Sequence, residues 1–268
     1  MSINHLLIMT SHYPSTTHSR ERYTPGQTAT SLAFMAERSL ESHGAALLSW
    51  LRPGQQVLDL GCGPGTITSG IADRVFPGCV TGVDARREPL ETARRLAEGC
   101  EQVNLTYTCA TAYRLPFDTA SFDLIFSHAL MEHLEDPALA LAEIQRVLRP
   151  GGTLVLASPD WDHFVFDQAS SDVLSAIRLY RAIQEQNGGD TRAGQSLGGW
   201  VQEAGLLVRE GGERLETYSS TLQIAQYLAA QLEAEGEYAA ARALVRWSTR
   251  PGARFHQCWR HVIATKAD

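Results

Sequence analysis

The sequence contains no run of lysine or arginine, and lysine is nearly absent from the stretches with a helical pattern. The formal net charge is -7, and the basic residues are scattered arginines such as Arg86, Arg87, Arg94 and Arg95. A protein that binds a phosphate backbone usually gathers positive charge on one face. The composition therefore disfavours nucleic acid as a substrate or partner.

Cysteines at metal-ligand spacing and long apolar runs are also missing. The five cysteines are odd in number and no two are spaced as a metal site requires. This favours reduced thiols in a cytoplasmic protein and predicts no bound metal. The short apolar run from Leu6 to Met9 lacks the basic flank and the length of a signal peptide. Because no run approaches the length of a membrane span, we expect no membrane partner.

The sequence does contain enough apolar residues for a sizeable core. Hydrophobic residues make up 44% and charged residues 20% of the 268 positions, proportions typical of a globular protein with one large or two small domains. We predict an N-terminal arm with short leading helices over residues 1–50 and a main domain over residues 51–268. Residues 1–20 have no period, and two helices broken near Gly44 are expected between residues 28 and 50.

Strand and helix patterns alternate from residue 57 to residue 157. The second expected helix has a proline near its first turn and a glycine past its end, as helices commonly do. Residues 122–127 are apolar on both faces, as in a buried parallel strand. This alternation predicts an α/β fold, a parallel sheet covered by helices on both faces. The expected strands are residues 57–60, 79–83, 103–109, 122–127 and 153–157, and the helices are residues 66–75, 89–97 and 137–148.

The second half departs from this alternation. We expect helices over residues 169–187 and 197–204 and strands within residues 206–218 and 255–265. An Ala-rich helical segment covers residues 221–247, with a break at Gly236, so that residues 220–252 form a helical insertion before the last strand. Its aromatic residues either form a lid over a ligand site or fill the core of an ordinary helix pair.

The most informative stretch is a buried strand that breaks into three glycines, Gly61, Gly63 and Gly65, before a helix. Glycines at such a turn let the backbone bend sharply and let a ligand approach the main chain. A ligand there would also meet the free N–H groups of the next helix. One acid, Asp59, lies inside the strand end and another, Asp84, ends the next expected strand. This pairing favours a nucleoside site over a plain turn.

Each of these acids has two possible roles. Asp84 either accepts both hydroxyls of a ribose, because a carboxylate offers two acceptor oxygens, or caps the helix that begins near Pro89. Asp59 either caps N–H groups of the glycine loop or holds an amino group of the ligand.

Several motifs then occur in order between residues 55 and 158. They are Val57-Leu58-Asp59-Leu60-Gly61-Cys62-Gly63-Pro64-Gly65, Asp84, Leu115-Pro116-Phe117, Ser121-Phe122-Asp123-Leu124-Ile125 and Val147-Leu148-Arg149-Pro150-Gly151-Gly152. Together they resemble the class I S-adenosylmethionine-dependent methyltransferases, and most closely the group with ubiquinone/menaquinone and small natural-product methyltransferases. The resemblance implies a Rossmann-like, seven-stranded, mostly parallel sheet whose last strand is antiparallel. Residues 206–218 and 255–265 would be its sixth and seventh strands.

The resemblance also implies S-adenosyl-L-methionine as cofactor, S-adenosyl-L-homocysteine as product and methyl transfer to nitrogen, oxygen or carbon of a small molecule. Gly61 and Gly63 would lie against the methionine part of the cofactor. Asp84 would bind the ribose. Ala85 and Arg86 would flank the adenine.

Further positions are assigned in the same way. Thr111 and Ala112 would contact the edge of the adenine, and Ser127 would close over the methionine end. Similar sequences usually carry an acid where Thr111 stands, and a threonine hydroxyl makes a weaker hydrogen bond there. Tyr23 and Phe34 would close the other side of the pocket, with Tyr23 against the cofactor.

Two histidines, His128 and His133, follow the expected fourth strand at the carboxyl edge of the sheet, where ligands bind in such folds. A sulfonium methyl is already activated, so positioning in a dry site supplies much of the rate. A base is needed only if the acceptor must lose a proton. Both histidines are candidate catalytic residues because histidine titrates near neutrality, and His128 is also a candidate cofactor contact. The alternative for His133 is a packed ring bonded to backbone. Trp161, His163 and Phe164 follow the fifth strand and face the same site.

Three rival functions stay open. A methyltransferase for RNA or protein is disfavoured, because the Asn/Asp-Pro-Pro-Tyr signature is absent after the fourth strand. A dinucleotide oxidoreductase is disfavoured because Thr66 stands near where the third glycine of Gly-x-Gly-x-x-Gly would be. A non-catalytic cofactor-binding partner subunit would share the site without turnover. We expect a monomer or a homodimer.

Overall fold

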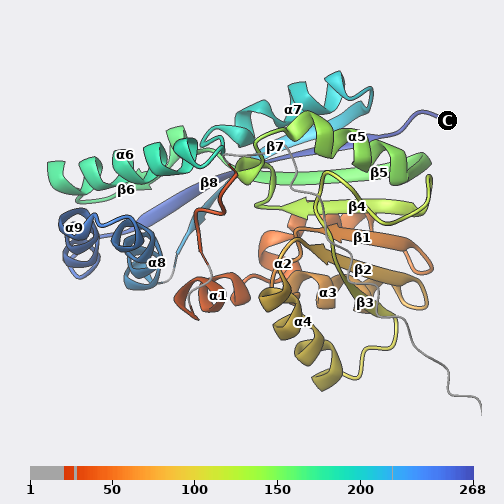
Figure 1. The fold of residues 1–268 in the computed structure, drawn as a ribbon, viewed down its shortest axis with the longest axis horizontal. Helices are drawn as coiled ribbons and strands as arrows, with labels where there is room; N and C mark the ends of the chain where they lie inside the picture. The colour runs from red at the N-terminus through yellow and green to blue at the C-terminus, as the bar shows by residue number, and fades with distance from the viewer. Residues whose placement is uncertain (1–20, 27–28, 219) are drawn as a thin grey trace, which may run out of the picture.

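The fold of this chain is a single eight-stranded sheet with helices packed around it, and Figure 1 shows the arrangement. The computed structural model describes residues 21–26, 29–218 and 220–268. The strand order is β3-β2-β1-β4-β5-β8-β6, and β7 pairs with β8. The strands are β1 (Gln56–Leu60), β2 (Cys79–Asp84), β3 (Leu105–Cys109), β4 (Phe122–His128), β5 (Leu148–Pro159), β6 (Val165–Phe166), β7 (Leu207–Thr217) and β8 (Phe255–Thr265).

Strands β1 to β5 are parallel to one another. Successive side chains of a strand point to opposite faces, so neighbouring residues enter different cores. Leu58 and Leu60 pack in one core with α5 (Pro137–Val147) and α7 (Ala193–Glu203). Val57 packs in the other with α3 (Thr66–Val75). The predicted α/β architecture, a mostly parallel sheet covered on both faces, is confirmed.

Only the last strand, β8, reverses direction, as expected, and β7 runs in the same sense as β5. Strand β8 is antiparallel to β5, and β7 is antiparallel to β8. The strand count differs by one from the expected seven, because the two-residue strand β6 pairs with the beginning of β8. Two residues carry no periodic signal, so the sequence pattern could not indicate this strand.

Several element boundaries also differ from expectation. Strand β5 begins at Leu148, whereas Arg149-Pro150-Gly151-Gly152 was expected to stand between helix and strand. Helix α4 (Arg87–Gly99) begins before Pro89. Strand β3 begins at Leu105, and Val103 is largely exposed. Boundaries depend on local hydrogen bonds that the apolar pattern does not record.

The segment that leads into the sheet contains three short helices: α1 (Ala29–Ala36), α2 (Leu40–His43) and η1 (Ala45–Trp50). The expected break near Gly44 is present. A second break occurs at Ser39, whose side chain accepts from the Ser42 N–H in a capping box. The predicted arm over residues 1–20 lies outside the described residues.

A third hydrophobic core lies beyond the sheet, where α6 (Ser171–Gln186), α8 (Thr221–Ala234) and α9 (Tyr238–Ser248) gather at the left of Figure 1. Helices α8 and α9 are separated at Gly236, which has φ 82°. Phe34 of α1 and Trp161 enter the same core. We call these three helices the helical lobe. The lid role of residues 220–252 stays a prediction.

Candidate active site

A cavity of about 340 Å³ lies at the carboxyl ends of β1, β2 and β4. This is the edge of a parallel sheet where ligands generally bind. The cavity brings together almost all residues that the sequence singled out for the cofactor. Those that line it are Tyr23, Asp59, Gly61, Gly63, Asp84, Ala85, Arg86, Thr111, Ala112, His128 and His133.

The glycine loop between β1 and α3 has a left-handed backbone, with φ 79° at Gly61 and 52° at Gly63. Such angles favour glycine because a Cβ crowds the backbone. The Gly61 N–H donates to Val83 O at 2.7 Å, which ties the loop to β2. A Cβ built on Gly63 would meet nothing within 4 Å. The main chain at Gly63 therefore faces open space where a ligand can approach.

Asp84 fixes this loop from the end of β2. Its Oδ2 accepts from the Gly63 N–H at 3.1 Å, and its Oδ1 accepts from the Arg86 N–H at 3.0 Å. The N-cap of α4 is Arg86, so Asp84 is not the cap of that helix. Each carboxylate oxygen has further acceptor capacity, which leaves Asp84 able to receive hydroxyl groups from a ligand.

Asp59 is buried at the end of β1 and accepts a hydrogen bond from Thr68 Oγ1 at 2.6 Å. Burial raises the pKa of its carboxyl to about 7. Thr68 lies on α3, so Asp59 ties the strand to the helix that follows the loop. Neither role proposed from sequence included this bond.

Tyr23 and Arg86 form the opposite wall of the cavity. The Arg86 guanidinium carbon lies 3.7 Å from the centroid of the Tyr23 ring, a cation–π contact. The Tyr23 ring also meets the His133 ring edge-on, with centroids 4.8 Å apart. Burial raises the pKa of the Tyr23 hydroxyl, which stays protonated at neutral pH. The leading segment thus closes the cavity from above the sheet edge.

The residues predicted to contact the adenine edge line the cavity, whereas Ser127 does not. Thr111 and Ala112 line the cavity beyond β3, where the Ala110 N–H donates to Asp84 O at 3.1 Å. Ser127 does not line the cavity, and its hydroxyl donates to Leu60 O at 2.8 Å. Because that bond joins β4 to β1 inside the sheet, Ser127 holds the two strand ends together.

His128 is buried and His133 is half-buried, and both are uncharged at neutral pH. Burial, and then the charge of Arg38, lower the pKa of His128 well below its usual value. Burial, followed by Arg86 and Arg38, lowers the pKa of His133 to about 3. Within the described part of the chain, Nδ1 of each ring is buried without a hydrogen-bond partner. Each ring is therefore available as an acceptor rather than as a cation.

A second, smaller cavity of about 40 Å³ lies beside the first. The two share Tyr23, Arg38, Ala129 and His133, which we call the junction residues. The sequence had assigned Tyr23, Phe34, His133, Trp161 and Phe164 to a site. The other wall residues were not assigned, because most of them come from poorly matched segments of the chain. Its aromatic walls are Phe34, Trp161, Phe164, Tyr180, Tyr227, Phe255 and Trp259.

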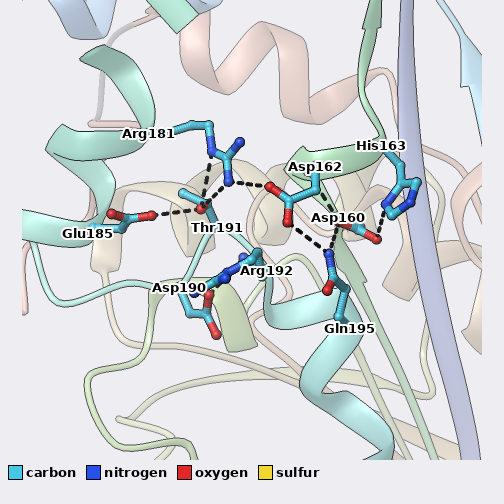
Figure 2. A network of polar contacts seen from close by, with 9 residues as sticks. All are labelled: Asp160, Asp162, His163, Arg181, Glu185, Asp190, Thr191, Arg192 and Gln195. Carbon is cyan, nitrogen blue, oxygen red and sulfur yellow. Dashed lines mark hydrogen bonds and ion pairs between the residues drawn. The ribbon is translucent and has the colours of Figure 1, made fainter. Parts of the chain in front are cut away.

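Figure 2 shows the polar network that holds the turn η3 (Trp161–His163) after β5. Asp160 is fully buried and accepts from Gln195 Nε2 at 2.7 Å and from Arg260 Nε at 2.6 Å. It also pairs with His163 Nδ1 at 2.8 Å. His163 therefore serves this network, while Trp161 lines the second cavity.

Neither a metal site nor a membrane span is found in the described residues. No group of three or more His, Cys, Asp or Glu side chains there could hold a metal ion. No helix in the same ranges has both the length and the apolar character to cross a bilayer.

Known proteins resemble part of this chain. A family model described as a methyltransferase domain matches residues 58–156. An uncharacterized methyltransferase of Schizosaccharomyces pombe is 31% identical over 185 residues, 63% of this chain and 63% of that protein. A trans-aconitate 2-methyltransferase of an Azoarcus species is 36% identical over 128 residues, 48% of each chain. The chain therefore matches less than two thirds of the length of either relative.

A solved structure gives the corresponding comparison of folds. The phosphoethanolamine N-methyltransferase 2 of Haemonchus contortus, solved in complex with S-adenosyl-L-methionine, aligns with a TM-score of 0.57 and 18% identity. The alignment covers 90% of this chain and 58% of that chain. At this identity the likeness concerns the fold.

Proposed function

Because the chain belongs, through the domain at residues 58–156, to the class I S-adenosylmethionine-dependent methyltransferases, we propose that it methylates a small molecule with S-adenosyl-L-methionine. The observation that carries this proposal is the link between Gly63 and Asp84. This hydrogen bond places the accessible main chain of Gly63 next to the Asp84 carboxylate in the wall of one cavity. S-adenosyl-L-homocysteine is the corresponding product.

The residues of the larger cavity fit this cofactor. Asp84 has acceptor capacity for ribose hydroxyls, and the space in front of Gly63 accommodates the methionine chain. Thr111, Ala112 and Arg86 line the same cavity; in this proposal the first two contact the adenine edge and Arg86 its face. When bound, the cofactor supplies a methyl group activated by the sulfonium.

We place the acceptor in the second cavity. Its aromatic walls exclude water, and holding the acceptor in line with the methyl group supplies much of the rate. His133, which lines both cavities, acts there as a neutral hydrogen-bond acceptor that orients the methyl acceptor, and His128 acts in the same way from the larger cavity. The relative named trans-aconitate 2-methyltransferase also supports a small-molecule acceptor. The proposed enzyme works in the cytoplasm without nucleic acid or membrane, as a monomer or homodimer.

Calorimetric titration with S-adenosyl-L-homocysteine tests the cofactor site. We expect a Kd of about 1 μM, which corresponds to about -8 kcal/mol. Asp84→Asn should weaken binding by about 1.5–3 kcal/mol, the range for hydrogen bonds to a charged group. The matched control Asp118→Asn, outside the cavity, should bind as the wild type does. A wild-type protein that gives no heat at millimolar ligand would disprove the assignment.

Turnover separates an enzyme from a non-catalytic partner subunit. Transfer of labelled methyl groups should be screened against small carboxylates, phenols and amines, with RNA and protein as separate arms. We expect label in a small molecule. Label appearing in RNA or protein alone would favour the rival substrate classes.

A further inference from the structure

Arg38 lies between α1 and α2 and reaches the place where the two cavities meet. It is one of the junction residues. Its guanidinium carbon lies 5.9 Å from the centroid of the Phe34 ring and 5.7 Å from that of Trp259. The guanidinium therefore lies near two aromatic rings and borders both cavities.

No described residue supplies a counter-ion for this cation. Its Nε is buried without a hydrogen-bond partner, and no carboxylate oxygen of the described chain forms an ion pair with it. Contacts with two rings compensate a guanidinium only in part. Arg38 is half-buried, and its buried Nε–H lacks an acceptor, so a ligand oxygen that accepts from it would remove an unsatisfied donor.

The charge of Arg38 acts to lower the pKa of two carboxyl groups, Glu216 and Glu132, and both of these already have other partners. Glu216 lies 3.2 Å from His43 Nε2 and 3.2 Å from Arg214, and it accepts from Trp259 Nε1 at 3.0 Å. Glu132 accepts from Ser158 Oγ at 2.9 Å, and burial raises its pKa to about 7. Neither carboxyl group forms a direct ion pair with Arg38, so the guanidinium has room for a further anionic partner.

We propose that Arg38 binds a carboxylate of the methyl acceptor, so that the acceptor is a small organic acid whose apolar part lies against the rings of the second cavity. This inference rests on the proposed function. A guanidinium matches a carboxylate with two parallel hydrogen bonds. Phe34, Trp161 and Trp259 supply flat apolar surface around that position. The cofactor's own carboxylate is the other source of the same chemistry.

Ligand-observed NMR with benzoate and acetate tests the site on protein saturated with S-adenosyl-L-homocysteine. The uncharged amides, benzamide and acetamide, are the matched probes. We expect both acids to bind the wild type, and Arg38→Gln to weaken them at least tenfold. Arg38→Lys should lose less, and the amides should not discriminate among the variants. The control Arg74→Gln, on the surface, should behave as the wild type.

Two results would overturn the inference. The first is equal binding of the acids to the wild type and Arg38→Gln, or no saturable binding to either. The second is a tenfold loss of S-adenosyl-L-homocysteine binding in Arg38→Gln with 5′-methylthioadenosine, which lacks the carboxylate, unaffected. That pattern would show that Arg38 binds the carboxylate of the cofactor rather than that of the methyl acceptor.

A stability measurement provides an independent readout. Benzoate should raise the melting temperature of the wild type more than that of Arg38→Gln, because only the wild type keeps the guanidinium that binds the acid. An equal rise in both proteins would contradict the inference. If the wild type fails to bind S-adenosyl-L-homocysteine, the proposed function fails on its own. The acid titrations on unliganded protein still report on Arg38.

Discussion

Burial decides what His128 and His133 can do in the site. With the pKa of His133 lowered to about 3, the neutral ring takes a proton from an alcohol only at a large energetic cost. A carboxylate acceptor needs no such base, because it is already deprotonated at neutral pH. The histidines and Arg38 therefore favour the same kind of acceptor for different reasons.

Glu132 makes the stability of the protein depend on pH. Its folded pKa of about 7 exceeds the ordinary 4.5, so its contribution is fully present below pH 4.5 and is lost as pH rises through 7. The loss is up to about 3 kcal/mol. Glu132→Gln should therefore gain unfolding free energy relative to the wild type between pH 5 and pH 8, measured by urea denaturation.

The exposed Glu88→Gln is the control for that titration and should follow the wild type at every pH. A constant difference between Glu132→Gln and the wild type across this range would mean that the folded carboxyl is ionised throughout.

Replacing two glycines of the same loop by alanine should have different effects, mainly on ligand binding at Gly63 and mainly on stability at Gly65. Gly63→Ala adds a methyl group to open space at φ 52°, so it should cost about 1 kcal/mol of stability and weaken S-adenosyl-L-homocysteine binding at least tenfold. Gly65→Ala would place its Cβ 2.7 Å from the Ala93 Cβ and should cost about 3 kcal/mol. Denaturation and calorimetry on both variants separate the two effects. Equal stability losses would refute the contrast.

Among the structural elements, the turn η3 depends on Asp160. Asp160→Asn removes a fully buried charge and leaves Arg260 and His163 without it. We expect a loss of about 3 kcal/mol in unfolding free energy, at the lower end for breaking a buried pair. Asp162→Asn, which weakens a partly exposed ion pair with Arg181, should lose less than about 1 kcal/mol. Similar losses in both variants would show that burial does not set the difference.

At the scale of the molecule, the helical lobe has its own core, separate from the two that cover the sheet. Smaller separate cores open with less free energy than the global transition. Amide hydrogens of α8 and α9 should therefore exchange faster than those of β1 and β4, measured by mass spectrometry. If the lobe is a lid, bound cofactor product and acid together should slow exchange in α8 and α9. Unchanged exchange there would leave them as ordinary core helices.

The part of the fold predicted from the sequence is the part with strong local signals. Buried strands, the glycine loop and the acids Asp59 and Asp84 report their surroundings through short-range patterns. The sequence did not assign roles to Arg38 and Glu132, because these roles depend on partners from distant elements. Ser127 was misplaced for the same reason, since its bond to Leu60 crosses between strands. The second cavity combines the leading segment, β8 and the lobe, a combination that no single stretch encodes.

The hold of Asp84 on the glycine loop also has a consequence for the speed of binding. Its two oxygens bond the N–H groups of Gly63 and Arg86, so the loop loses its conformational freedom when the protein folds. A ligand that binds at this loop, as the proposed function requires, therefore avoids the entropic cost of ordering it. We expect binding to such a preformed surface to be a single kinetic step whose rate rises in proportion to ligand concentration.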